Sequence, residues 1–176
     1  VVLDKKLKKK FFLVEDGVRP NAAILDASLT VGLPKAITIG SSMDALTHAV
    51  EGVINNSHHF IAWGSGLFAI RLIAENLPKV VANGRDLEAR QRMLVASTMA
   101  NFGGLQGSGI SHALAHTVGA SYGIHHGTAC GIALPHAMRY NRDFCLDEMV
   151  LIAESLGVDV RRMSKVEAAD AAAQAV

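Results

Sequence analysis

Apolar residues recur every three or four positions from about residue 42 to the end of the chain, which is the period of a helix with one buried face. This pattern predicts seven helices, at about 42–54, 62–77, 87–102, 109–119, from 128 onwards, 143–157 and from 164 to the C-terminus. Ser42 is a suitable N-cap for the first helix and would place Asp44 in its first turn. Pro78 should end the second helix at the preceding residue.

The later helices carry their own start and stop signals. Asp86 and Asp143 can cap the third and sixth helices, and residues 164–167 have the Ser-x-x-Glu spacing of a capping box. Gly103-Gly104 should end the third helix, and Pro135 lies inside the fifth as an expected kink.

Two short apolar runs precede the helical region. Residues 11–14 and 22–25 are predicted to be strands, because Gly17 and Pro20 mark a turn between them. The chain is therefore expected to be mainly α, with a short β segment at its N-terminus.

Composition narrows the function classes. Half of the 176 residues are apolar and 19% are charged, as in a globular protein, and the formal net charge of +1 offers no general footprint for nucleic acid. No uninterrupted apolar run reaches the roughly 18 residues of a membrane span. The two cysteines form no C-x-x-C pair and no secretory pattern precedes them, so we expect a cytoplasmic protein with neither nucleic acid nor membrane as a partner. The absence of an initiator Met suggests a cut or incomplete chain.

The first helix carries a polar stripe on an otherwise apolar surface. Asp44, His48 and Glu51 fall on one side of it, and a helix that is apolar over most of its surface is buried. A buried carboxylate and imidazole need partners. A metal ion would satisfy both, and the alternative is a structural hydrogen bond between Asp44 and His48.

The fourth helix repeats the arrangement with two histidines. His112 and His116 lie one turn apart, so both can bind one metal, one can bind while the other stands behind it, or the pair can be structural. His126 follows a glycine-rich turn, a position from which a loop can present a ligand. Three imidazoles and one carboxylate suit a divalent first-row metal, which would act as a Lewis acid.

The remaining histidines and Cys130 have simpler interpretations. His58 and His59 lie in a polar linker and should be solvated, whereas His136 should be a packed or surface residue. Cys130 lies in an apolar run, which favours a small buried thiol.

At these residues the chain resembles the iron-containing (group III) alcohol dehydrogenases. The resemblance is carried by residues 43–51, 109–116, 122–127 and 134–141. It implies a dehydroquinate synthase-like helical metal-binding domain and a metal held by four ligands. By motif, these ligands correspond to Asp44, His48, His112 and His126, with His116 as a nearby catalytic histidine.

The resemblance also implies a cofactor and a domain division. Residues 1–40 would be a remnant of a Rossmann-like nucleotide-binding domain, and 41–176 a helical metal-binding domain that we expect to be incomplete at its C-terminus. Lys10 corresponds to a lysine at the cofactor ribose, and His126 would also border the cofactor. NAD or NADP, Fe²⁺ and a small alcohol or aldehyde are the implied ligands. Zn²⁺ would suit the same residues, and apolar surface exposed at the missing domain interface would favour a homo-oligomer. His125 stands where many members have proline.

The family's glycine-rich phosphate-binding loop does not occur in this sequence, so we expect the chain alone to bind NAD poorly and to be weakly active or inactive. Two other functions stay open: a dehydroquinate-synthase-like metal-dependent lyase, and a non-catalytic, truncated metal-binding module.

Overall fold

The structure is a computed structural model that describes residues 2–4, 6–7, 9–11, 20–56, 59–104 and 108–176. Its described helices are α1 Lys35–Val53, α2 Phe60–Ala82, α3 Leu87–Gly104, α4 Ile110–Tyr122, α5 His126–Asn141, α6 Leu146–Ser155 and α7 Lys165–Ala175. Short 3₁₀ turns, η2 and η3, cover Ala27–Thr30 and Arg142–Phe144. The prediction of a mainly α fold is confirmed.

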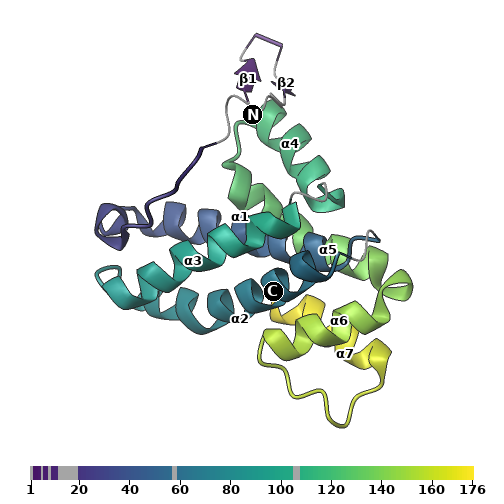
Figure 1. Ribbon diagram of the computed structural model, residues 1–176. Coiled ribbons are helices and arrows are strands. Elements are labelled where there is room, and N and C mark those ends of the chain that lie inside the picture. The colour runs from purple at the N-terminus through teal and green to yellow at the C-terminus, as the bar shows by residue number, and fades with distance from the viewer. Residues whose placement is uncertain (1, 5, 8, 12–19, 57–58, 105–107) are drawn as a thin grey trace.

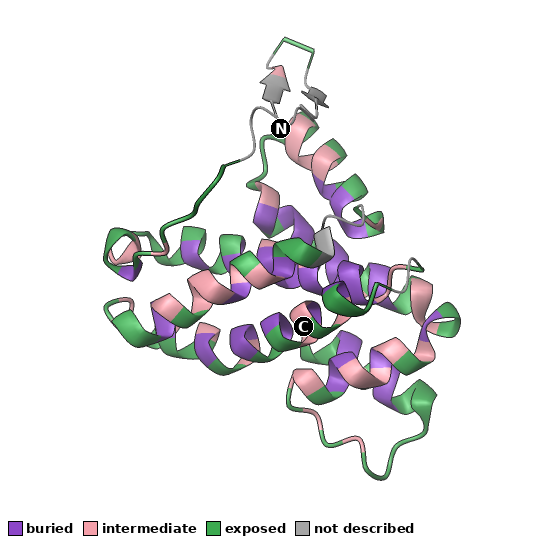
Figure 2. Ribbon diagram, viewed as in Figure 1, coloured by how far each residue is buried: buried purple, intermediate pink, exposed green. Residues whose placement is uncertain are grey.

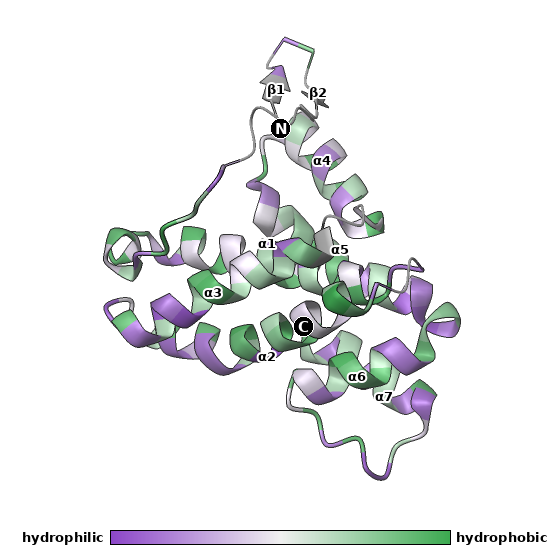
Figure 3. Cartoon of the chain, viewed as in Figure 1, coloured by the Kyte–Doolittle hydropathy of each residue, from purple (hydrophilic) through white to green (hydrophobic). Residues whose placement is uncertain are grey.

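Helices α1, α2 and α3 pack against one another, and α5 packs between α1 and α4 (Figure 1). Helices α6 and α7 form a pair that contacts α2 and α5. Buried residues gather on the inward faces of this bundle (Figure 2), which are also its more hydrophobic faces (Figure 3). The main core draws on six of these helices, with Val50, Ile70, Ala96, Leu134 and Ile152 each fully buried. Burying this apolar area is the main stabilising term of the fold.

Helix α2 is long and apolar enough to cross a membrane by length and composition alone. In this structure it is a helix of the bundle, because its buried residues Ala69, Ile70 and Ile73 belong to the main core.

The N-terminal strands differ from the prediction. Strand β1, Val2–Asp4, pairs antiparallel with β2, Lys9–Phe11, with Leu3 opposite Lys10. Of the predicted strand at 11–14, residues 12–14 lie outside the described residues. The predicted strand at 22–25 is wrong: the segment has no regular structure, and Ile24 is 91% exposed. Among the described residues no strand pairs with the backbone of this segment, so its apolar composition alone does not make it a strand.

Helix α1 begins seven residues before the predicted Ser42, so the prediction that Asp44 lies in the first turn is wrong. Pro34 precedes the helix, and the serines inside it turn their hydroxyls back onto the preceding turn. Ser41 Oγ donates to the Ile37 carbonyl at 2.8 Å, and Ser42 Oγ donates to the Thr38 carbonyl at 2.7 Å. Serine can therefore continue a helix that packing already holds.

Helix α2 also extends beyond its predicted end. Pro78 lies inside it, and the helix continues for another turn to Ala82 because Val80 is buried against the bundle. His59, which was predicted to be solvated, is exposed and caps this helix, since Nδ1 accepts from the Ala62 N–H at 3.3 Å. His58 lies outside the described residues.

The other end signals have mixed outcomes. Asp86 accepts from the Ala89 N–H at 2.9 Å as a cap of α3, and the capping box of Ser164 and Glu167 at α7 is present. The predicted cap of α6 by Asp143 is wrong, because Asp143 pairs with Arg142 and Cys145 precedes the helix instead.

Two glycines bring α1 and α5 close together. A Cβ placed on Gly127 would lie 1.9 Å from the Gly40 carbonyl oxygen, and one on Gly40 would lie 2.7 Å from His125 Nδ1. Gly127 cannot hold a larger residue without moving a helix, because its added Cβ would meet the Gly40 backbone, whereas an added Cβ on Gly40 would displace the side chain of His125. This crossing sets where the first turn of α5 lies relative to α1.

We expect Gly127→Ala to lower the free energy of unfolding by about 1–3 kcal/mol or more, because the added methyl group overpacks the crossing. Urea unfolding of the chelator-treated protein measures the change. Gly64→Ala is the matched control, since Gly64 is a helical glycine whose added Cβ meets nothing within 4 Å. Equal stability of the two variants would contradict the close-packed crossing.

Candidate metal centre

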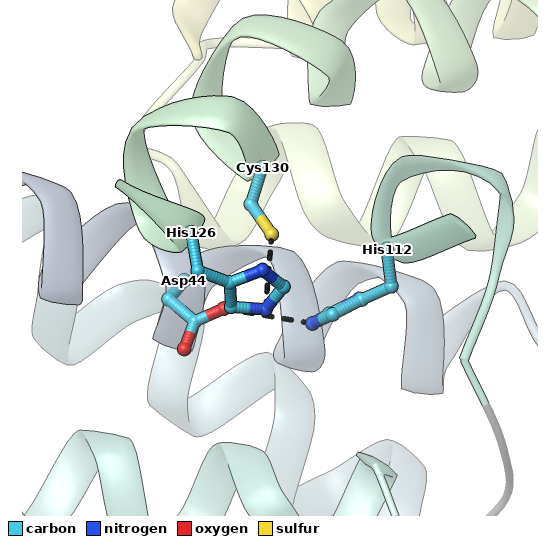
Figure 4. Close-up of side chains that lie close together, drawn as sticks. All are labelled: Asp44, His112, His126 and Cys130. Atoms are coloured by element: carbon cyan, nitrogen blue, oxygen red, sulfur yellow. Dashed lines mark hydrogen bonds and ion pairs between the residues drawn. The ribbon is translucent and has the colours of Figure 1, made fainter. Parts of the chain in front are cut away.

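Three helices bring the predicted ligands to one place. Asp44 and His48 lie on α1, His112 on α4, and His126 is the first residue of α5. Figure 4 shows the side chains of Asp44, His112 and His126 converging from these helices.

The donor atoms of the four residues are close to one another. Asp44 Oδ1 lies 3.4 Å from His126 Nε2 and 3.6 Å from His112 Nε2. The same oxygen is 4.0 Å from His48 Nε2, and the Nε2 atoms of His48 and His112 are 3.2 Å apart. Asp44 Oδ1 thus lies within 4.0 Å of an imidazole nitrogen of each of three histidines that are far apart in the sequence.

These separations fit a shared cation. Donor atoms about 2.1 Å from one ion in a tetrahedral arrangement lie roughly 3.4 Å from each other. Asp44 Oδ1 is also buried without a hydrogen-bond partner of good geometry among the described residues. A buried carboxylate oxygen that lacks a donor is costly, and a cation is the partner that this arrangement accommodates.

Glu51 is the main structural support of the centre. Its carboxylate accepts from the backbone N–H of Gly109 and of Ser111, each at 2.7 Å, and lies 2.6 Å from His112 Nδ1. It therefore binds the start of α4 to α1 and leaves His112 Nε2 facing Asp44. The helical spacing placed Glu51 on the same side of α1 as Asp44 and His48, and these contacts agree with that placement.

The ionisable groups of the centre are strongly coupled. Burial disfavours the charged form of His112, but its contacts with Asp44 and Glu51 outweigh burial and raise the pKa of the ring to about 9. Burial, assisted by the nearby His112, holds the pKa of His48 below its ordinary value. Burial alone would raise the pKa of the Asp44 carboxyl, yet the contact with His112 and the charges of His48 and His126 keep it lowered.

His116 lies beside the centre, on the side of His126. The two rings are 4.9 Å apart between centroids and nearly perpendicular, whereas the His112 and His116 centroids are 6.4 Å apart. Of the two α4 histidines, His112 therefore faces Asp44, and His116 stands one turn further along the helix.

Cys130 was missed by the sequence interpretation. It is fully buried, as predicted, but its Sγ lies 3.7 Å from His126 Nε2. Its sulfur and one donor atom each of Asp44, His112 and His126 all lie within 4.8 Å of one another (Figure 4). The available signal was the four-residue spacing from His126, which places both residues on one face of α5.

The other predicted residues lie away from the centre or stay untested. His125 and His136 are exposed, and the ring of His125 packs against Gly40. Lys10 belongs to β2, and its side chain lies outside the described residues, so its cofactor role stays a prediction.

The sequence profile of the Fe-containing alcohol dehydrogenase family, C-terminal part, matches residues 38–176. The whole chain aligns with 46% of the 1,3-propanediol dehydrogenase of Klebsiella pneumoniae, and the aligned residues are 37% identical. A second alignment covers 98% of this chain and 45% of the NAD-dependent methanol dehydrogenase of Bacillus methanolicus, with 36% identity. The chain spans about half the length of these curated relatives.

Solved structures share the fold. The crystal structure of sulfoacetaldehyde reductase from Bifidobacterium kashiwanohense in complex with NAD⁺ matches 99% of this chain and 46% of its own, with a TM-score of 0.83 and 32% identity.

We expect Glu51→Gln to lower the free energy of unfolding of the metal-free protein by roughly 3 kcal/mol, because it removes one of the two carboxylates beside the buried His112 ring and the charge that accepts from two backbone N–H groups. Urea unfolding measures the loss. Glu75→Gln is the control: it removes an exposed carboxylate from an i, i+4 pair with Arg71 on α2 and should change little. Similar stabilities of the two variants would argue against the support assigned to Glu51.

The raised pKa of His112 predicts a pH dependence of the metal-free protein. Between the ordinary value of 6.5 and about 9, the folded state holds a proton that the unfolded state has lost, so stability falls as pH rises through this window. Urea midpoints at both ends of the window, in the presence of a chelator, measure the fall. The fall should be smaller in His112→Gln, and a wild-type stability that rises over this window would contradict the assignment.

Proposed function

Since this chain belongs to the Fe-containing alcohol dehydrogenase family, we propose that it forms the metal-binding helical part of an oxidoreductase that interconverts an alcohol and an aldehyde with a nicotinamide cofactor. One observation carries the proposal: Asp44 Oδ1, buried without a hydrogen bond among the described residues, faces the Nε2 atoms of three histidines. We propose Asp44, His48, His112 and His126 as the ligands of one divalent cation.

When bound, Fe²⁺ or Zn²⁺ would supply a Lewis acid for the alcohol oxygen, and NAD or NADP would accept the hydride. The residues of this chain set the charge at that point: one carboxylate and three neutral imidazoles leave a dication with a formal charge of about +1. Glu51 keeps the proton of His112 on Nδ1, so that Nε2 offers its lone pair to the cation.

His116 is the proposed proton relay. Its ring lies against that of His126, with the centroids 4.9 Å apart, so it can exchange a proton beside the cation. The names of the relatives, a propanediol dehydrogenase and a methanol dehydrogenase, support a small alcohol as the substrate class.

The cofactor region and the setting are further parts of the proposal. We propose that residues 1–40 are part of a nucleotide-binding domain and that Lys10 contacts the cofactor. Helix α1 crosses the proposed boundary between residues 40 and 41. A reduced, cytoplasmic setting is supported by Cys130 and Cys145, which form no disulfide bond.

We expect the purified chain, stripped with a chelator and reloaded with Fe²⁺ or Zn²⁺, to retain one ion per chain by elemental analysis. Asp44→Ala and His126→Ala should weaken retention at least about tenfold, because each removes a proposed ligand. His136→Ala is the control, as an exposed histidine of α5. Full retention in both ligand variants would refute the proposed ligands, whereas a wild-type chain that retains no metal would favour the non-catalytic alternative.

The reaction needs its own test. Loaded chain at high concentration, with NAD⁺ and a simple alcohol, should form NADH slowly, and the rate should vanish in Asp44→Ala. Phosphate elimination and cyclisation without NADH formation would favour the lyase alternative instead.

A further inference from the structure

We propose that Cys130 Sγ is an additional ligand of the cation held by Asp44, His112 and His126. This inference rests on the proposed metal site, and it adds a sulfur donor to a ligand set otherwise made of nitrogen and oxygen.

The sulfur lies within reach of a shared ion. Zinc–sulfur and zinc–nitrogen bonds of about 2.3 and 2.1 Å place the two donors roughly 3.6 Å apart in a tetrahedral arrangement. Cys130 Sγ and His126 Nε2 are 3.7 Å apart. The donor atoms of Cys130, Asp44, His112 and His126 lie within 4.8 Å of one another, so a contraction of no more than about 1 Å in any wide pair would let all four bind one ion, with His48 as the fifth donor.

The surroundings of the sulfur favour this role. Cys130 is fully buried and forms a small apolar cluster with Ala115 of α4 and Ala129 of α5. The cluster holds the sulfur between the two helices that carry His112 and His126, and Figure 4 shows Sγ directed at the His126 ring. Its place on α5, one turn from His126, means that the two donors move together.

The second cysteine provides an internal comparison. Cys145 is also buried, but its thiol donates to the Asn141 carbonyl at 3.2 Å, and no cluster of donor atoms among the described residues includes it. Burial, with the nearby Glu148, raises the pKa of the Cys145 thiol to about 11. Burial alone therefore does not make a cysteine of this fold a ligand; the neighbours of Cys130 do.

A thiolate would change the properties of the centre. As the sulfur binds the ion, its S–H bond breaks and the proton passes to solvent. The carboxylate and thiolate together then neutralise a dication, and the soft sulfur favours Zn²⁺ and Co²⁺ over Mg²⁺ or Mn²⁺. Cys130 would also occupy a coordination position that oxygen ligands could otherwise take.

Cobalt substitution tests the proposal. Titration of the chelator-treated chain with Co²⁺ should produce visible d–d bands from the site and a sulfur-to-cobalt charge-transfer band in the near ultraviolet. In Cys130→Ser, the charge-transfer band should be lost while the visible bands persist, and Zn²⁺ affinity in a competition with a chromophoric chelator should fall at least about tenfold. In Cys145→Ala, the matched control, both sets of bands should persist.

X-ray absorption of the zinc-loaded chain provides a second measurement, because one sulfur at about 2.3 Å should appear in wild type and be absent in Cys130→Ser. Visible bands without charge transfer in wild type would overturn the role of Cys130 and leave the proposed site standing. Failure of the wild-type chain to bind Co²⁺ would overturn both the role of Cys130 and the proposed metal site. Circular dichroism of each variant verifies that the fold is intact.

Discussion

The geometry of the centre depends on one buried carboxylate. Glu51 lies on α1, yet it takes hydrogen bonds from two backbone N–H groups at the start of α4 and contacts the ring of His112. Helix starts leave N–H groups without partners, and a negative charge there is favoured by the helix dipole. One side chain therefore caps a helix, joins it to its neighbour and orients a proposed ligand. Asp44 and His112 face each other because Glu51 holds both helices in this register.

The second requirement is the absence of side chains where α1 and α5 cross. Gly40 and Gly127 let the backbones approach, which places His126 within 3.4 Å of Asp44. The bundle around this crossing is rich in fully buried alanines, such as Ala49 and Ala96, and small residues of this kind allow helices to lie close together. The site thus depends on small residues that contribute no chemistry of their own.

The helical spacing of the sequence predicted which residues share a face of the helix, but it did not predict where the helices begin and end. Ser42 predicts a helix start and Pro78 a helix end, and both predictions are wrong. Ser42 donates its hydroxyl to the carbonyl of the preceding turn and stays inside α1, and burial of Val80 lets α2 continue past Pro78. The stripe of Asp44, His48 and Glu51 was nonetheless predicted correctly, because the side on which a residue lies depends on its spacing and not on where the helix begins. Capping signals succeeded where the partner is a few residues away, as at Ser164 and Glu167.

Features that depend on distant neighbours escaped prediction. The run at 22–25 has a strand-like composition but no partner, and the position of Cys130 beside Asp44 and His112 follows from helix packing that no local pattern contains. The family resemblance supplied the ligand set, whereas the contacts of Glu51 with the start of α4 required the three-dimensional arrangement.

The proposed ligands join parts of the chain that are distant in sequence, from residue 44 to residue 126. A cation bound there would act as a reversible cross-link that closes this long loop, and closing a long loop removes conformational freedom from the unfolded chain. Resistance to heat would then depend on the free metal concentration by mass action, with no change in the sequence. A protein built in this way would couple its lifetime in the cell to metal supply.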